Sequence, residues 1–197
     1  VMVSQFFGAK NRRELSITIG NCITLTALAS LIIMVVGALG IRPLLELLNT
    51  PESIIDWCDS YLMILIMGIA GCAYYNILCG ILRGLGDSIS ALLYLLVATV
   101  LNIILDLFFV ATLHMGVAGV ALATVIAQAI SAVLCVIKLC KMEDIFDMGV
   151  SHLKISGHHT MTIIRLGLPS GLTQAIFSLA MIIVQSLTNS FGELVIA

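Results

Sequence analysis

The residue best suited to chemistry in this sequence is Asp106, a carboxylate inside an otherwise apolar run from Ser88 to Leu113. Asn102 precedes it by four residues and Thr99 by seven, so in an α-helix the three polar side chains share one face. Carboxylate and amide oxygens in such a stripe could ligate a cation. Alternatively, Asp106 could hold a proton, because desolvation favours the neutral carboxyl group, or it could form a structural hydrogen bond between helices.

Four further polar side chains interrupt apolar runs elsewhere in the chain. Thr124 and Gln128 lie four residues apart on one predicted helix, while Asn76 and Gln174 each lie in a different one. A polar side chain within lipid usually hydrogen-bonds a neighbouring helix. A structural role is therefore favoured over substrate contact for each of these residues, although all four remain candidates for lining a pocket.

Several classes of function lack the motifs that they need. The sequence contains no Gly-x-Ser-x-Gly, no His-Glu-x-x-His and no phosphate-binding loop, so neither an enzyme nor a nucleotide-driven pump is indicated. The neighbouring His158 and His159 have no ligand partner at metal-binding spacing. A net charge of −2 with no basic tract argues against nucleic acid as a partner. We expect no cofactor, and we expect the six cysteines to act as small buried side chains.

The composition is that of an integral membrane protein. Hydrophobic residues make up 60% and charged residues 10% of the chain, and the mean hydropathy is +1.17. A soluble domain has about 45–50% apolar and about 25% charged residues. Because about 20 apolar residues span a bilayer as a helix, the uncharged runs predict an all-α polytopic bundle of five full spans. The predicted helices are 15–41, 57–82, 88–112, 115–138 and 166–190.

The distribution of basic residues predicts the orientation of these helices. Alternate loops carry eight Lys and Arg residues against one, Arg42, in the remaining loops. The basic loops, near 10–13, 83–88 and 138–165, are therefore predicted to be cytoplasmic. The small residues Gly119, Ala123, Ala127 and Ser131 recur every fourth position, which favours close packing of their helix against another.

Both ends of the sequence carry apolar residues too few to span a membrane. Residues 1–9 are predicted to be the last turns of a preceding helix, and residues 194–197 begin another apolar run. We therefore expect an internal piece of a longer polypeptide, whose other helices would be its partners.

Five motifs occur in the order and at the spacing found in one transporter family. They are residues 3–10 (VSQFFGAK), 81–88 (ILRGLGDS), 102–106 (NIILD), 116–128 (GVAGVALATVIAQ) and 166–171 (LGLPSG). With these motifs the chain resembles the multidrug and toxic compound extrusion (MATE) family. The resemblance extends over essentially the whole chain.

The resemblance implies a secondary antiporter of twelve helices in two lobes. It would export cationic or amphiphilic compounds in exchange for Na⁺ or H⁺. On this interpretation residues 1–138 form part of the N-terminal lobe, 139–164 a cytoplasmic linker and 165–197 the start of the C-terminal lobe. The chain would run from the end of the second helix through the seventh, in contact with membrane lipid. A bacterial plasma membrane suits such a chain.

The resemblance also assigns roles to individual residues. Asn102 and Asp106 match an Asn and Asp pair on the fifth helix that binds the coupling cation, and Thr124 matches a Thr on the sixth. Asn76 falls where a fourth-helix Asn lines the same pocket. The first-helix Asp of that site lies outside this chain. Gln174 stands near the place where some members have a seventh-helix Glu, which disfavours that variant.

Two alternatives remain open from the sequence. A flippase for a lipid-linked precursor, from the same superfamily, would be expected to carry Arg or Lys within its spans for the pyrophosphate, and these spans have none. A non-transporting fragment is the second alternative.

Overall fold

The computed structural model describes residues 1–47, 52–142, 144–146 and 156–190, and every regular element in these ranges is a helix. The elements are α1 (Met2–Gly8), α2 (Arg12–Leu47), α3 (Glu52–Met67), α4 (Ile69–Gly84), α5 (Ser88–Leu107), the π-helix η1 (Phe108–Thr112), α6 (Gly116–Cys140) and α7 (Gly157–Ser190). The predicted all-α membrane fold is confirmed. The chain divides into two units, Val1–Ile155 and Ser156–Ala197, and α7 is the helix of the second.

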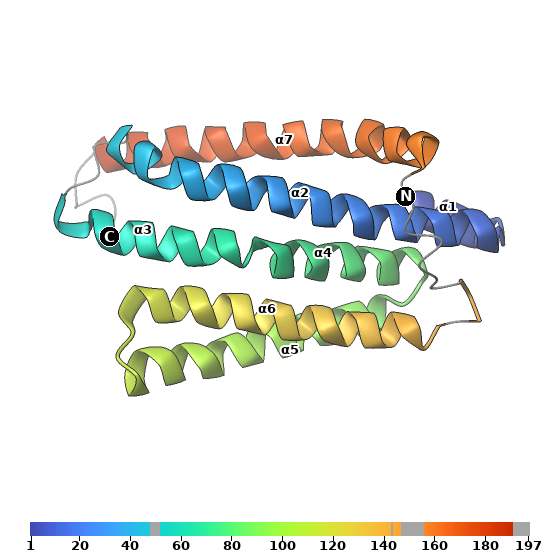
Figure 1. The fold of residues 1–197 in the computed structure, drawn as a ribbon, viewed down its shortest axis with the longest axis horizontal. Helices are drawn as coiled ribbons and strands as arrows, with labels where there is room; N and C mark the ends of the chain where they lie inside the picture. Colours follow the sequence, from blue (N-terminus) through green and yellow to red (C-terminus); the bar gives the residue numbers. More distant parts are fainter. Residues whose placement is uncertain (48–51, 143, 147–155, 191–197) are drawn as a thin grey trace. The chain divides into compact units, whose positions relative to one another are not determined.

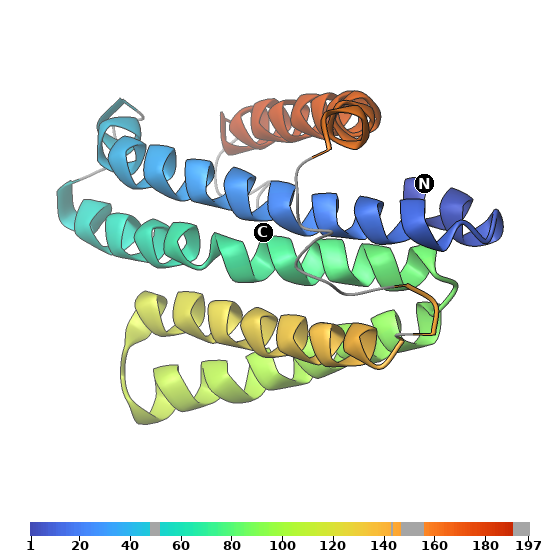
Figure 2. The same cartoon turned by 45° about the vertical axis from the view of Figure 1, so that its right-hand side comes forward.

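The helices of the first unit lie alongside one another, with α4 in the middle. It packs against α2 on one side and α6 on the other, and α5 packs against α6 (Figures 1 and 2). The first turn of α2, with Arg12, and the last turns of α4 and α6, with Arg83 and Lys138, lie at the same end of this bundle (Figure 1). We call it the basic end.

The second predicted span is bent rather than straight. Among the described residues, four helices are long and apolar enough to cross a membrane. The pair Ile54–Met67 and Ile69–Gly84, which bends by 44°, gives up to five spans if it counts as one. The bend occurs at Gly68, where a β-carbon would lie only 2.2 Å from Cγ2 of Val125 on α6. The helix therefore breaks at a glycine that lies directly against the side chain of Val125 on α6.

Three helices extend several residues beyond the bounds predicted from hydropathy. α3 begins at Glu52 instead of residue 57. α2 continues past Ile41 to Leu47 and contains Pro43 near its end. α7 begins at Gly157, inside the stretch assigned to the linker, because polar residues such as His158 and Thr162 do not prevent helix formation. The domain bounds remain predictions, and the apolar run 194–197 lies outside the described residues.

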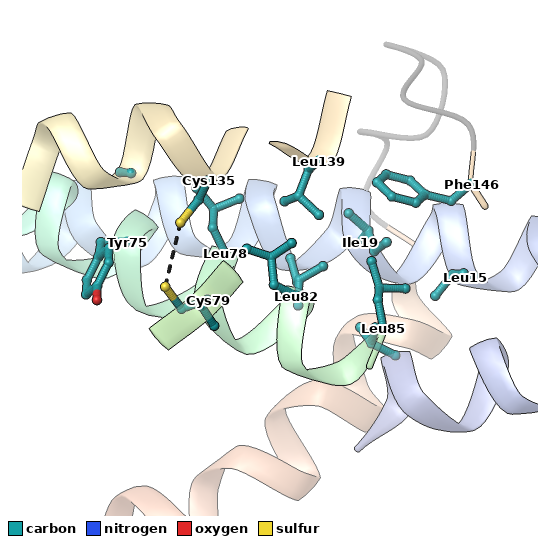
Figure 3. Packing of buried hydrophobic residues seen from close by; sticks show 14 residues of the cluster. Leu15, Ile19, Tyr75, Leu78, Cys79, Leu82, Leu85, Cys135, Leu139 and Phe146 are labelled. Atoms are coloured by element: carbon teal, nitrogen blue, oxygen red, sulfur yellow. Dashed lines mark hydrogen bonds between the residues drawn. The ribbon is translucent and has the colours of Figure 1, made fainter. Parts of the chain in front are cut away.

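The core of the first unit lies between α2, α4 and α6 towards the basic end (Figure 3). Leu82 of α4 and Leu139 of α6 are 0% and 1% exposed, and Phe146, beyond α6, closes the cluster at 1%. The thiols of Cys79 and Cys135 are also buried there, with their Sγ atoms 3.6 Å apart. For these two cysteines the predicted role as small core residues is confirmed. The prediction is wrong for Cys140, which is exposed at the end of α6, and the other three cysteines are half-buried.

The small-residue face of α6 is buried as predicted. Gly119, Ala123, Ala127 and Ser131 all lie in the interior. On the neighbouring helix, a β-carbon at Gly71 would lie 3.5 Å from that of Ala129, which is ordinary contact between closely packed helices. Close approach of α4 to α6 therefore depends on small side chains at their interface.

Candidate functional site

A hydrogen bond between α5 and α6 forms the centre of the candidate site. Asn102 Nδ2, on α5, donates to Thr124 Oγ1, on α6, over 3.3 Å. Thr124 Oγ1 donates its own proton to the carbonyl oxygen of Val120, 3.0 Å away and one turn earlier on the same helix. This back-bond leaves the lone pairs of the hydroxyl oxygen to accept from the amide of Asn102.

Asp106 lies one turn beyond Asn102 on α5. Its Oδ1 atom is buried and has no hydrogen-bond partner among the residues that the structure describes. A buried polar atom without a partner costs about 1–3 kcal/mol, and more when it is charged. A bound proton, a cation or a polar group from outside the described residues would therefore stabilise this carboxylate.

The backbone changes its helical form immediately after Asp106. Residues Phe108–Thr112 form a π-helix, in which the amide of Leu113 donates to the carbonyl of Phe108 over 3.1 Å. Such wide turns are rare and often occur at functional sites. Here the turn brings Phe109 against Gly119 of α6, where an added β-carbon would lie 3.0 Å from Cβ of Phe109.

The other predicted pocket residues do not join this contact. The amide of Asn76 donates to the carbonyl of Cys72 over 2.8 Å, and Thr99 Oγ1 donates to the carbonyl of Leu95 over 3.0 Å, so each is bonded within its own helix. Gln128 is half-buried on α6, one turn after Thr124, and Gln174 is exposed on α7 in the second unit. The structure thus brings together Asn102 and Thr124, with Asp106 on the adjacent turn.

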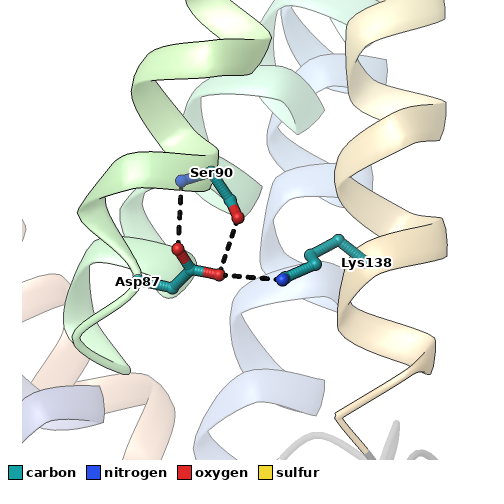
Figure 4. A network of polar contacts seen from close by, with 3 residues as sticks. All are labelled: Asp87, Ser90 and Lys138. Atoms are coloured by element: carbon teal, nitrogen blue, oxygen red, sulfur yellow. Dashed lines mark hydrogen bonds and ion pairs between the residues drawn. The ribbon is translucent and has the colours of Figure 1, made fainter.

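A second polar contact joins α5 to α6 at the basic end (Figure 4). Asp87 Oδ1 accepts from the backbone amide of Ser90 over 3.0 Å, and Oδ2 accepts from the hydroxyl of Ser90 over 2.7 Å. Lys138 Nζ, in the last turn of α6, lies 3.2 Å from Oδ2. Two polar contacts therefore hold α5 against α6. The Asp87–Lys138 ion pair lies at the basic end, and the Asn102–Thr124 hydrogen bond lies towards the other end.

The turn before α5 fixes the position of Asp87. Gly86 has φ +87°, which a residue with a side chain adopts only with strain. Its amide donates to the carbonyl of Arg83 over 3.1 Å, and the amide of Asp87 donates to that of Leu82 over 2.9 Å. Together these bonds end α4 in a Schellman motif.

Neither the capping role of Asp87 nor its pairing with Lys138 is among the features predicted from the sequence. An Asp directly before a helix, with a hydroxyl residue three positions later, is the signal that predicts the cap. No local signal predicts the ion pair, because Lys138 lies 51 residues further along the sequence.

Comparison with known proteins gives the family. The sequence profile of the family named MatE matches residues 1–108, which is more than half of the 197 residues. The chain belongs to the MatE family. The resemblance to multidrug and toxic compound extrusion (MATE) transporters seen in the sequence motifs is therefore confirmed.

Relatives and solved structures of MATE proteins cover most of this chain. It is 32% identical to the probable multidrug resistance protein YpnP of Bacillus subtilis over 78% of the chain and 34% of YpnP. It is 31% identical to YoeA of the same organism, a probable multidrug resistance protein, over 98% of the chain and 43% of YoeA. A crystal structure of MATE in complex with MaD3S superposes with a TM-score of 0.89 at 26% identity, covering 97% of the chain and 43% of that protein.

The MATE chain described here spans less than half the length of these relatives. The two Bacillus subtilis relatives are named as multidrug resistance proteins, which is consistent with a transporter. The roles of Asp106, Asn102 and Thr124 in binding a coupling cation are not tested by the family membership and remain predictions.

Asp87→Asn is expected to destabilise the complete MATE protein by up to about 1 kcal/mol at neutral pH, because asparagine still caps the helix but loses the charge that pairs with Lys138. Hydrogen bonds from the amide and hydroxyl of Ser90, and then Lys138, lower the pKa of the Asp87 carboxyl group. A lowered folded-state pKa stabilises the protein above the ordinary value near 3.8, and this contribution is lost as the pH falls through the folded value. Thermal unfolding between about pH 7 and pH 2 should therefore show the variant and wild type converging in acid.

Ser90→Ala is the matched control for this prediction, because it removes the hydroxyl donor and keeps the backbone donor. It should lower the melting temperature less than Asp87→Asn does. A difference between Asp87→Asn and wild type that stays constant down to the lowest pH would contradict the assignment.

Proposed function

We propose that this chain forms part of the N-terminal lobe and the start of the C-terminal lobe of a secondary antiporter. The complete protein exports cationic or amphiphilic compounds in exchange for Na⁺ or H⁺. Membership of the MATE family and the multidrug resistance proteins among its relatives support this activity. The observation that carries the ion coupling is the buried, unpartnered Oδ1 atom of Asp106 beside the Asn102–Thr124 bond.

The donor set suits a small hard cation or a proton. Because the side-chain amide nitrogen of Asn102 donates to Thr124, the side-chain carbonyl oxygen of Asn102 remains as an acceptor for a ligand. A carboxylate oxygen from Asp106 and an amide oxygen from Asn102, one turn apart on α5, can ligate Na⁺. With a proton instead, a neutral Asp106 would donate to the same amide oxygen.

Coupling follows from different ion affinities in two states of the protein. A cation or proton at Asp106 stabilises one packing of the α5–α6 hairpin, and the bound drug stabilises the other. The two lobes would then alternate between openings to the two sides of the membrane. The excess of Lys and Arg at the basic end supports a cytoplasmic location for that end. The bacterial relatives support a bacterial plasma membrane.

Thr124→Val is expected to weaken the apparent affinity for the coupling ion by about fivefold, the effect of losing one hydrogen bond worth about 1 kcal/mol. Valine keeps the shape of threonine but cannot accept from Asn102, so the amide is no longer oriented. Thr124→Ser keeps the hydroxyl and should resemble wild type. The apparent ion affinity of both variants is measured as the Na⁺ concentration that gives half-maximal efflux, or as the midpoint of the pH dependence of efflux. If Thr124→Val and wild type have equal ion affinity, Thr124 does not take part in ion binding.

The proposed function is tested by ethidium efflux from cells that lack their own exporters and express the complete reading frame. Imposed Na⁺ and pH gradients are applied separately. Efflux that follows one gradient supports the antiporter and identifies its ion. A well-expressed protein that gives no efflux under either gradient would favour the lipid-linked precursor flippase or a non-transporting protein.

A further inference from the structure

A cavity of about 330 Å³ opens at the basic end, remote from Asp106. It lies between the end of α1, the start of α2 and the short segment 144–146 that follows α6. Phe6, Phe7 and Leu15 line its apolar part, while Lys10, Arg12 and Asp144 bring charged groups to it. Neither the ion site nor the core accounts for this combination.

Backbone and side-chain contacts hold the walls of the cavity in place. Lys10 has φ +53°, and its amide donates to the carbonyl of Phe7 over 3.0 Å, which fixes the bend between α1 and α2. Arg12 Nη1 donates to the backbone carbonyl of Asp144 over 3.1 Å. The adjacent Phe146 is 1% exposed and anchors the segment in the core.

The charges around the cavity are of both signs. Lys10 and Asp144 are exposed and form no ion pair or side-chain hydrogen bond within the described part of the chain. Arg12 adds a second cation beside them. A purely anionic ligand would face the carboxylate of Asp144, and a purely cationic ligand would face two basic side chains. The complementary ligand therefore carries a negative and a positive group on one short headgroup.

We propose that this cavity binds the headgroup of a zwitterionic phospholipid with a primary ammonium group, of the phosphatidylethanolamine class. The lipid phosphate contacts Lys10 and Arg12, and the ammonium donates hydrogen bonds to the carboxylate of Asp144. The acyl chains leave along Phe6 and Phe7. The basic end lies where α2 enters the membrane, which is the depth of a phospholipid headgroup.

The site is tested on the purified complete protein in detergent, with no transport measured, so its failure would leave the antiporter proposal unaffected. Binding of phosphatidylethanolamine, phosphatidylcholine and phosphatidylglycerol with matched acyl chains is compared by native mass spectrometry. We expect phosphatidylethanolamine to bind roughly tenfold more tightly than the other two, the factor for one hydrogen bond to a charged group. Phosphatidylcholine lacks the N–H donors, and phosphatidylglycerol lacks the ammonium.

Two variants test which residues bind the ammonium and the phosphate of the headgroup, and a third variant is the control. Asp144→Asn should abolish the preference for phosphatidylethanolamine over phosphatidylglycerol, and Lys10→Gln should weaken binding of all three lipids. Lys141→Gln, exposed near the same end but outside the cavity lining, is the matched control and should bind as wild type does.

Several results would overturn the proposal. Equal or tighter binding of phosphatidylglycerol would show a general anionic-lipid surface, and full competition by inorganic phosphate would show a phosphate site. If Asp144→Asn keeps the preference for phosphatidylethanolamine, the ammonium does not bind Asp144. If wild type binds lipid no more tightly than Lys10→Gln does, the phosphate does not bind Lys10.

Discussion

Asp106→Asn in the complete protein is expected to lower cation-driven efflux at least roughly tenfold while leaving expression unchanged. Coupling free energies between two ligands of about 1–3 kcal/mol correspond to about 5–150-fold changes in affinity. Asparagine keeps the size of the side chain but removes both the negative charge and the titratable proton. The neutral amide also removes an uncompensated buried charge, so folding should not suffer. Ethidium efflux normalised to membrane-inserted protein measures the effect.

Asp59→Asn provides the matched control. Asp59 is a half-buried aspartate on α3 and should tolerate the same substitution. Asp106→Glu keeps the charge on a longer side chain, and we expect it to retain ion dependence with a shifted midpoint. If Asp106→Asn transports as well as the Asp59→Asn control, the carboxylate has no part in coupling.

Gly68→Ala is expected to destabilise the protein by about 1–3 kcal/mol, the usual cost of overpacking a close helix contact. The new β-carbon would lie 2.2 Å and 2.5 Å from the two methyl groups of Val125 on α6. No φ strain contributes, because Gly68 has φ −86°. The clash must therefore be relieved by moving α6 or by straightening the bend between α3 and α4. Thermal unfolding of the purified protein measures the loss.

Alanine at Gly80, in contrast, should not lower the melting temperature. A β-carbon there would meet nothing within 4 Å, and alanine has the higher helix propensity. Gly80→Ala should therefore leave the melting temperature unchanged or raise it slightly. Adding Val125→Ala to Gly68→Ala should restore most of the stability by removing the clashing methyl groups. Equal melting temperatures for the two glycine variants would contradict the packing argument.

Features that depend on local periodicity could be predicted from the sequence. Hydropathy alone located the membrane helices, and the helical repeat placed Asn102 and Asp106 on one face of α5. The four-residue spacing from Gly119 to Ser131 correctly predicted a buried face of α6. Thr124 was assigned to the site only through the family resemblance, and the structure places it within hydrogen-bonding distance of Asn102.

Features that depend on a distant contact could not be predicted. Gly68, where the bend occurs, lies against Val125 on α6, and the ion pair of Asp87 joins it to Lys138, 51 residues further along the sequence. Hydropathy also gave no sign of the π-helix after Asp106, because the turn changes the backbone and not the polarity. Asn76 was placed in the pocket by resemblance, yet its amide bonds to Cys72 on its own helix.

Drug-driven movement of the coupling ion tests the central claim most directly. The complete protein is reconstituted into liposomes with equal Na⁺ concentration and pH on both sides and with Na⁺-sensitive and pH-sensitive dyes inside, and ethidium is added to the outside. Because coupling is reciprocal, the drug gradient should drive Na⁺ or H⁺ in the opposite direction in wild type. Asp106→Asn liposomes should show no such movement. Ion movement that persists in Asp106→Asn, or that is absent from active wild-type protein, would contradict cation coupling at this site.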